Sequence, residues 1–152
     1  MRFRSAANQD VAALGALKLR ASLALGEHLE QLEALPEARA FPPEHLAFAV
    51  VAEVEGTLVG FVTVLPETDG RAELEDLFVD PDLWRRGIGR RLIAEAEALA
   101  LAAGARVLRV VANSPAFYVA CGFEAVGEVE TLFAPAPVME KRLCGDRACA
   151  SR

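Results

Sequence analysis

Four arginines stand within seven residues near the middle of the sequence: Arg85, Arg86, Arg90 and Arg91. The chain as a whole is acidic, with 16 Lys and Arg residues against 22 Asp and Glu residues and a formal net charge of −6. A local excess of positive charge in an acidic chain favours an anionic ligand. The alternative interpretation is the solvated first turn of a helix.

The segment from Arg85 to Arg90 reads Arg-Arg-Gly-Ile-Gly-Arg and lies between a predicted strand and a predicted helix. The first turn of a helix offers unpaired N–H groups and a partial positive charge, and glycines let a phosphate approach the backbone closely. Arginine side chains add charge-assisted hydrogen bonds. A short glycine pattern is weak evidence by itself, and a tight turn is the alternative.

Two classes of phosphate site can be tested against this segment. A P-loop requires Gly-x-x-x-x-Gly-Lys-Ser/Thr, and the segment contains no lysine, so that class is excluded. A dinucleotide fingerprint requires a third glycine at position 92, which is Leu92. It also belongs to an early strand–helix unit rather than to a segment that follows a hairpin. The segment therefore predicts an anion site of a different class.

The hydrophobic pattern predicts the elements that position this segment. Strands are expected at 2–5, 48–54, 58–65, 72–79, 107–111, 123–129 and 138–143, and helices at 11–25, 28–35, 87–103 and 115–121. This order predicts an α/β domain with a mixed, mostly antiparallel sheet of about six to seven strands flanked by about four helices. One domain is expected over 1–143, with a flexible C-terminal tail over 144–152. Asn8 and Asp10 are candidate N-caps of the first helix.

Composition excludes several classes of protein. The chain has 152 residues, of which 53% are hydrophobic, so it is globular rather than disordered. No apolar run is long enough to span a membrane, and the net negative charge argues against a nucleic-acid partner. The three cysteines (Cys121, Cys144 and Cys149) form neither a metal-binding pattern nor a disulfide framework, which favours a reducing, cytoplasmic location. The arginine-containing start at Met1 allows a transit peptide, but a first strand is favoured because no cleavage-type break follows.

The motifs resemble those of the GNAT superfamily of N-acetyltransferases. The sequence from Leu74 to Pro81, ending Val-Asp-Pro, and the following 85–92 resemble the family's strand, Val-x-Pro, Arg/Gln-x-x-Gly-x-Gly/Ala and helix. The stretch 113–123 resembles its second signature, Asn…Phe-Tyr…Gly-Phe, and the hairpin turn at 55–56 precedes Gly-Phe at 60–61 as the family's does. Two features depart from the pattern. Trp84 stands where the family usually has Arg or Gln, and the stretch from Asn113 to Phe117 is shorter than usual by about one helical turn.

The resemblance implies acetyl-CoA as cosubstrate and no metal. It places the diphosphate on the backbone amides of 85–90, with the pantetheine arm pairing along the strand edge at 77–79 as an added strand would. The helix that begins at Pro115 would flank the arm. The cofactor-binding residues implied are Leu77, Phe78, Val79, Arg85, Arg86, Gly87, Ile88, Gly89, Arg90, Asn113, Phe117 and Tyr118.

Amide formation needs a base for the acceptor ammonium, a donor to the oxyanion and a proton for the leaving thiolate. Glu73 and Glu75 share one strand face and are the candidate bases, with a solvated polar face as the alternative. A backbone N–H near Phe78 or Val79 is the candidate oxyanion donor. Tyr118, the single tyrosine, is the candidate general acid by the resemblance, and a packing aromatic otherwise. His28 or His45 as the base, and Cys121 as a nucleophile, are the further alternatives.

The expected function is acetyl transfer from acetyl-CoA to a primary amine by direct attack in a ternary complex. A non-catalytic acyl-CoA sensor and an interaction domain with an incidental phosphate site are the alternatives. The acceptor is unspecified, although the segments 26–41 and 131–137 are expected to determine it. Four glutamates of the first segment (Glu27, Glu30, Glu33 and Glu37) favour a cationic acceptor such as a small amine or a protein amine, or else form a solvated helix face. A homodimer is an expectation from the family alone.

Overall fold

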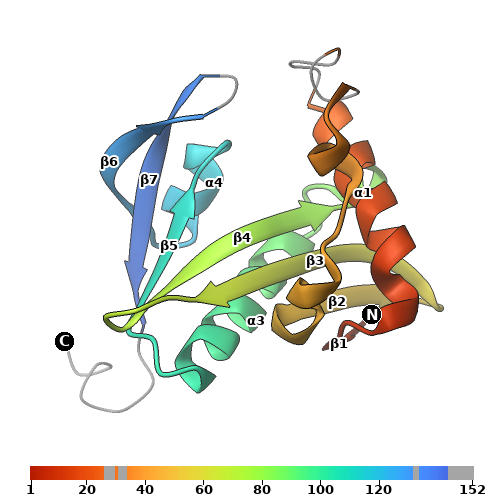
Figure 1. Cartoon of the computed structure of the whole chain (residues 1–152), viewed down its shortest axis with the longest axis horizontal. Coiled ribbons are helices and arrows are strands. Elements are labelled where there is room, and N and C mark those ends of the chain that lie inside the picture. Colours follow the sequence, from red (N-terminus) through yellow and green to blue (C-terminus); the bar gives the residue numbers. More distant parts are fainter. Residues whose placement is uncertain (26–29, 31–33, 132–133, 144–152) are drawn as a thin grey trace. The chain divides into compact units, whose positions relative to one another are not determined.

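The computed structural model describes residues 1–25, 30, 34–131 and 134–143, and Figure 1 shows their arrangement into helices and strands. The strands are β1 (Arg2–Ser5), β2 (Ala49–Val54), β3 (Thr57–Pro66), β4 (Arg71–Val79), β5 (Val107–Val111), β6 (Glu124–Glu130) and β7 (Pro135–Arg142). The α-helices are α1 (Val11–Leu23), α3 (Ile88–Ala102) and α4 (Pro115–Ala120). Short 3-10 helices are η1 (Asn8–Asp10), η2 (Pro36–Arg39), η3 (Pro43–Phe48) and η4 (Pro81–Leu83). The helix predicted at 28–35 falls mainly on residues outside the described ones.

The strands pair in the order β1-β2-β3-β4-β5-β7-β6. The ladder between β4 and β5 is parallel, whereas β1–β2, β2–β3, β5–β7 and β6–β7 are antiparallel. This confirms the predicted α/β fold with a mixed, mostly antiparallel sheet. The chain divides into two compact units, one of residues 1–63 with 76–95 and the other of 64–75 with 96–152. The predicted boundary at residue 143 stays a prediction, and 144–152 lie outside the described residues.

The first unit is built on the β2–β3 hairpin. Its two-residue turn places Glu55 at φ 50° and Gly56 at φ 81°, which are the left-handed angles of the turn that suits a twisted hairpin. Side chains of α1, η2–η3 and the hairpin then form one apolar cluster, in which Leu14 and Phe61 are fully buried. The rings of Phe41 and Phe61 meet edge to face at 5.7 Å.

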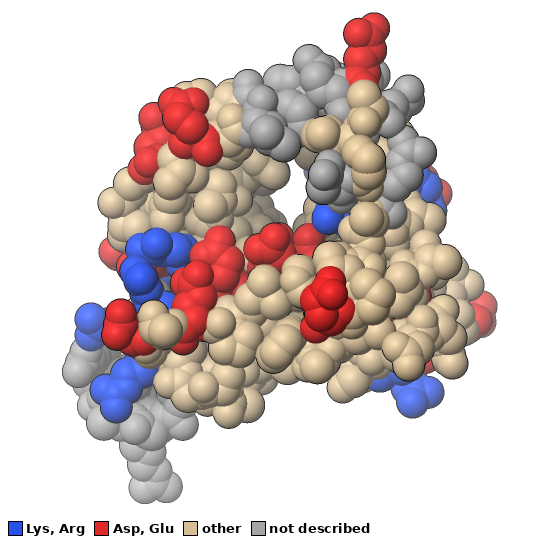
Figure 2. Space-filling model, in the orientation of Figure 1, with Lys and Arg blue, Asp and Glu red and all other residues tan. Residues whose placement is uncertain are grey.

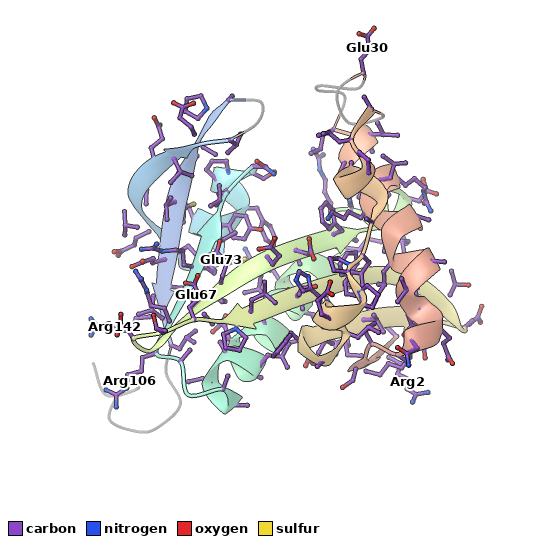
Figure 3. All side chains as sticks on the ribbon, viewed as in Figure 1. Arg2, Glu30, Glu67, Glu73, Arg106 and Arg142 are labelled. Atoms are coloured by element: carbon purple, nitrogen blue, oxygen red, sulfur yellow. The ribbon has the colours of Figure 1, made fainter. Side chains whose placement is uncertain are left out.

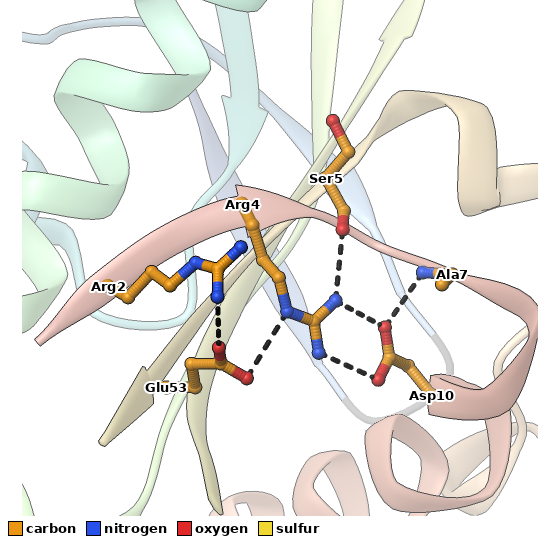
Figure 4. Close-up of polar contacts among 6 residues, drawn as sticks. All are labelled: Arg2, Arg4, Ser5, Ala7, Asp10 and Glu53. Atoms are coloured by element: carbon orange, nitrogen blue, oxygen red, sulfur yellow. Dashed lines mark hydrogen bonds and ion pairs between the residues drawn. The ribbon is translucent and has the colours of Figure 1, made fainter. Parts of the chain in front are cut away.

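Asp10 occupies the N-cap position of α1, as predicted, but its side chain makes no capping hydrogen bond to that helix. Its carboxylate is buried and accepts hydrogen bonds from both terminal nitrogens of Arg4, at 2.8 and 3.0 Å, and from the backbone N–H of Ala7 at 2.7 Å. Nε of Arg4 also donates to Glu53 of β2 at 3.2 Å (Figure 4). Arg4 therefore joins β1 to η1 through Asp10, and to β2 through Glu53.

The second unit places β5 beside β7, with α4 against β7. Its core includes the buried side chains of Leu108, Phe123 and Met139. Lys141 of β7 donates from Nζ to Oε2 of Glu97 in α3, at 3.0 Å, and to the carbonyl of Cys121 at the end of α4, at 2.8 Å. These bonds hold the C-terminal end of α4, where a cation is favourable because the helix dipole is negative there.

Candidate active site

Strand β4 alternates between a buried face and a less buried one. Ala72, Leu74 and Asp76 are buried, whereas Glu75 on the opposite face is exposed. Glu73 is half-buried and shares that second face with Glu75, as predicted from the period of two residues. The parallel ladder with β5 runs over Arg71–Glu73 of β4.

The peptide groups at the end of β4 point alternately to its two edges. The N–H of Asp80 donates to the carbonyl of Val59 in β3 at 2.7 Å. The carbonyl oxygen of Phe78 lies 3.1 Å from where a Cβ on Gly60 of β3 would be, so this group also faces β3. Because successive residues of a strand direct their N–H and C=O groups to opposite edges, those of Val79 face away from β3. Of the two candidate oxyanion donors, Phe78 has its N–H on the β3 side of the strand, whereas Val79 has its N–H on the edge that faces away from β3.

The indole of Trp84 contacts this edge directly. Its Nε1–H donates to the carbonyl oxygen of Val79 at 2.8 Å, and the side chain is 38% exposed. Sequence reasoning treated Trp84 only as a departure from the usual Arg or Gln. The contact joins residues on either side of the 3-10 helix η4. Because the sequence pattern did not predict η4, it did not indicate the contact between Trp84 and Val79.

The loop before α3 has an unusual backbone conformation. Arg85 and Gly87 both have left-handed angles, φ 65° and φ 82°, on either side of Arg86. Where left- and right-handed residues alternate, successive N–H groups turn toward one side and form a concave arrangement called a nest, which is a common anion-binding form of the backbone. Helix α3 begins at Ile88, one residue later than predicted, so the amides of Ile88, Gly89 and Arg90 belong to its first turn. The side chain of Ile88 is buried in the core.

The four arginines divide into two kinds. Arg85, Arg86 and Arg90 are exposed. Arg91 is exposed as well, but its guanidinium lies 4.4 Å from the ring centroid of Phe3 in β1, in a cation–π contact. Three of the four positive side chains next to the nest can therefore serve an anion, and Arg91 has a packing role.

In the second unit, Glu73 belongs to a group of charged side chains. Burial raises its pKa most, and the neighbouring carboxylates of Glu67 and Glu75 raise it further, against the opposing effect of Arg109 and Arg71. Figure 3 places Glu67 and Glu73 near each other on the same side of the sheet, and Figure 2 shows acidic and basic side chains gathered on this face. A carboxylate with a raised pKa holds a proton more strongly, which suits a general base.

Tyr118 lies in α4, which begins at Pro115 as predicted. The ring is only 8% exposed and packs edge to face against Phe117 at 5.1 Å and Phe123 at 5.4 Å. Burial raises the pKa of the phenol, and the nearby Cys121 adds to this, so the hydroxyl is protonated at neutral pH.

Comparison with known proteins decides the family. The model of the acetyltransferase (GNAT) family matches residues 17–123, which is most of the chain. The chain belongs to the GNAT family. No curated protein matches it.

Solved structures of GNAT proteins share the fold. A GCN5-related N-acetyltransferase of Rhodopseudomonas palustris is 26% identical over 93% of this chain and 95% of its own, with a TM-score of 0.75. The PaiA N-acetyltransferase of Thermoplasma acidophilum, solved with coenzyme A, is 22% identical over 93% and 98%, with a TM-score of 0.74. N-acetylglutamate synthase of Neisseria gonorrhoeae, solved with coenzyme A and N-acetyl-glutamate, is 21% identical, with a TM-score of 0.74. There the match covers 94% of this chain, which spans about a third (35%) of the synthase.

The predicted catalytic and cofactor-binding residues of this GNAT protein fall into two groups, each within one compact unit. The first unit holds Leu77, Phe78, Val79, Arg85, Arg86, Gly87, Ile88, Gly89 and Arg90. The second holds Glu73, Glu75, Asn113, Phe117 and Tyr118. Asn113 is exposed and Phe117 is half-buried beside Tyr118. Their roles toward a cofactor stay predictions.

Two of the three alternative catalytic residues, His45 and Cys121, lie among the described residues. Nδ1 of His45 is buried without a hydrogen-bond partner among the described residues, and its ring packs edge to face on Phe41 at 6.2 Å. Cys121 ends α4, with its N–H donating to the carbonyls of Phe117 and Tyr118. His28 lies outside the described residues.

Two features are absent from the described part of the chain. It contains no cluster of three His, Cys, Asp or Glu side chains that could hold a metal ion. None of its helices has both the length and the apolar character needed to cross a membrane.

Proposed function

We propose that this GNAT protein transfers the acetyl group of acetyl-CoA to a primary amine by direct attack in a ternary complex. The observation that carries the proposal is the nest formed by Arg85 and Gly87 at the start of α3, beside the strand edge at Val79. A doubly charged diphosphate matches the nest, and an extended amide-containing arm matches the strand edge.

The diphosphate is assigned to the amides from Arg85 to Arg90, with the exposed arginines adding charge. The pantetheine arm is assigned to the edge that carries the peptide groups of Leu77 and Val79. The same edge supplies the oxyanion donor, for which the alternation of β4 supports the N–H of Val79. Such a donor stabilises the tetrahedral intermediate because it is already oriented when the charge develops.

Glu73 is assigned as the base that takes a proton from the acceptor ammonium, directly or through water. Its raised pKa brings it closer to that of the amine than an ordinary carboxylate, so the proton transfer is less uphill. Glu75, on the same strand face but exposed, is the second candidate. The free amine then attacks the thioester carbonyl, and the C–S bond breaks as the amide forms.

Tyr118 is assigned as the donor to the departing sulfur. A phenol with a raised pKa is fully protonated but is a weaker acid, so it acts first as a hydrogen-bond donor. The proton passes to sulfur as negative charge accumulates there, CoA leaves as the thiol, and the phenolate of Tyr118 regains a proton from solvent. Packing between Phe117 and Phe123 fixes the ring for this role.

The acceptor is assigned to the class of cationic amines. The carboxylates of Glu67, Glu73 and Glu75 attract an ammonium group to the unit that holds the candidate base. Glu30 is exposed, while Glu27 and Glu33 lie outside the described residues. A cytoplasmic location and a homodimer remain predictions.

The experiment is a panel of amines incubated with acetyl-CoA, in which release of free CoA thiol is followed. Polyamines, amino sugars and lysine-containing peptides represent cationic acceptors, and an uncharged aromatic amine is the matched control. Thiol release above the amine-free background with a cationic acceptor supports the proposal. Tight CoA binding with no release from any acceptor would favour the acyl-CoA sensor instead.

A further inference from the structure

The hydrogen bond from Trp84 occupies a position that the proposed cofactor needs. A peptide-like arm lying along β4 pairs with carbonyl acceptors on the edge that faces away from β3. The carbonyl of Val79 is on that edge, and it already accepts a hydrogen bond from the indole Nε1–H at 2.8 Å. An indole N–H and a pantetheine amide N–H are equivalent donors toward such a carbonyl.

We propose that Trp84 is a stand-in donor, whose indole holds the Val79 carbonyl in the CoA-free protein and releases it when a pantetheine amide takes its place. This inference rests on the proposed function, because it requires the arm to lie along β4. It assigns to the unusual Trp84 a role in setting CoA affinity. The Arg or Gln usual in the family would not supply a rigid indole donor at this position.

The surroundings allow the indole to move while the backbone stays in place. Asp80 is fixed by its N–H bond to Val59 and by an ion pair with Arg20 of α1. The backbone N–H of Trp84 is bonded to the carbonyl of Pro81 at 3.3 Å. The side chain itself is 38% exposed, so a change of rotamer costs little buried apolar area.

Trp84 also directly precedes the nest. Arg85, the next residue, has the first of the two left-handed backbone angles. Release of the indole thus occurs beside the diphosphate-binding amides, and the arm and the diphosphate are recognised by adjacent residues. The pantetheine part of CoA, not its nucleotide, is the part that releases Trp84.

Intrinsic fluorescence tests this directly, because Trp84 is the single tryptophan. CoA and ADP are titrated separately, and their binding is measured in parallel by calorimetry. ADP carries the diphosphate without the pantetheine arm. We expect CoA to shift the emission with the same dissociation constant that calorimetry gives, and ADP at saturation to produce less than about a quarter of that shift.

Three results would count against the inference in different ways. Equal shifts from ADP and CoA, or calorimetric CoA binding with no shift, would overturn the stand-in role and leave the proposed function intact. No CoA binding in calorimetry would overturn both. The control is a double variant, Trp84→Phe with Phe48→Trp, whose reporter replaces a side chain of similar exposure, 36%, in η3. Its emission should not respond to CoA.

The variant Trp84→Phe provides a second test. It keeps an aromatic ring and removes the competing N–H, so CoA binding should tighten by roughly 2- to 10-fold, the worth of one exchanged hydrogen bond. ADP affinity should stay unchanged. Weaker CoA binding in this variant would show that Trp84 supports the cofactor instead of standing in for it.

Discussion

The guanidinium of Arg20 in α1 donates a hydrogen bond to Oδ1 of Asp80, at the turn between β4 and the nest. The same oxygen accepts the N–H of Asp82 at 2.9 Å and so caps η4. Burial raises the pKa of Asp80, but the bonds from Asp82 and Arg20 together lower it below its usual value. One carboxylate therefore links the first helix to the loop assigned to the cofactor.

Replacing Arg20 by Met should weaken this link while keeping an apolar stem. Because the Arg20 side chain is 55% exposed, we expect a loss of only about 0.5–1 kcal/mol in the free energy of unfolding. The KM for acetyl-CoA should rise several-fold with kcat less affected.

The link between Arg20 and Asp80 should also depend on pH. Since the pKa of Asp80 is lowered in the folded protein, its stabilising effect is present above the pKa of the unfolded chain and is lost as pH falls through the pKa of the folded protein. Denaturant titrations at pH 7 and pH 3 should therefore show a smaller difference between variant and wild type at pH 3.

Replacing Gly87 by Ala should weaken CoA binding. No atom lies within 4 Å of the added Cβ, so the penalty comes from the left-handed φ of 82° alone. That conformation costs a non-glycine residue about 1–2 kcal/mol. A loop that relaxes to avoid this cost loses its nest, and we expect roughly a 5- to 30-fold weaker affinity for CoA by calorimetry.

Gly56→Ala is the matched control for Gly87→Ala. Gly56 has φ 81° and also has no atom within 4 Å, but it lies in the β2–β3 turn. Both variants should lose similar stability, and only Gly87→Ala should lose CoA affinity. Equal CoA affinities in the two variants would contradict the assignment of the nest.

Replacing Glu73 by Gln should lower kcat/KM by roughly 10²- to 10⁴-fold, the usual worth of a general base. In the wild type, activity should fall as pH drops through a pKa above the ordinary glutamate value. Glu75→Gln is the control on the same strand face, and its pH profile should keep that acidic limb. If Glu75→Gln removed the limb and Glu73→Gln did not, the two roles would be exchanged.

Glu73→Gln should also stabilise the protein at neutral pH. A carboxyl whose pKa is raised on folding contributes stability below its unfolded pKa, and this contribution is lost as pH rises through the folded value. At pH 7 the ionised Glu73 is therefore unfavourable, and a neutral amide relieves it. Thermal unfolding should show a higher Tm for the variant at pH 7, with the difference disappearing near pH 4. A lower Tm at pH 7 would indicate that Glu73 has a stabilising partner.

Replacing Tyr118 by Phe should reduce turnover with little change in acetyl-CoA affinity. The edge-to-face contacts with Phe117 and Phe123 involve the ring and survive the loss of the hydroxyl. Phe123→Leu is a useful comparison, because it disturbs the packing and keeps the hydroxyl. Steady-state kinetics that gave an unchanged kcat for Tyr118→Phe would remove Tyr118 from proton donation.

The elements fixed by local chemistry were predictable from the sequence. The Glu55-Gly56 turn, the start of α4 at Pro115 and the apolar face of α3 each follow from residues within one element. The sequence pattern could not predict side-chain contacts between residues of different elements. Asp10 occupies the N-cap position of α1, as its residue type predicted, yet its carboxylate bonds to Arg4 and makes no capping bond to that helix.

The candidate site shows the same limit. The glycine spacing and the arginines predicted an anion-binding loop before α3; the loop lies there with left-handed angles at Arg85 and Gly87, and its binding of an anion stays a prediction. The charge count could not show that Arg91 stacks on Phe3, or that Trp84 bonds to Val79, because both depend on how distant segments pack. The raised pKa of Glu73 likewise depends on burial and on Glu67, six residues away.

The most direct test of the central claim uses acetyl-CoA labelled in its acetyl group, incubated with the protein and the best amine of the panel. Mass spectrometry of both the amine and the protein then shows where the label goes. Direct attack predicts label on the amine nitrogen and none on Cys121 or any other side chain. Label on Cys121 that chases into the amine would contradict direct transfer, and bound acetyl-CoA with no labelled amine would contradict the enzyme itself.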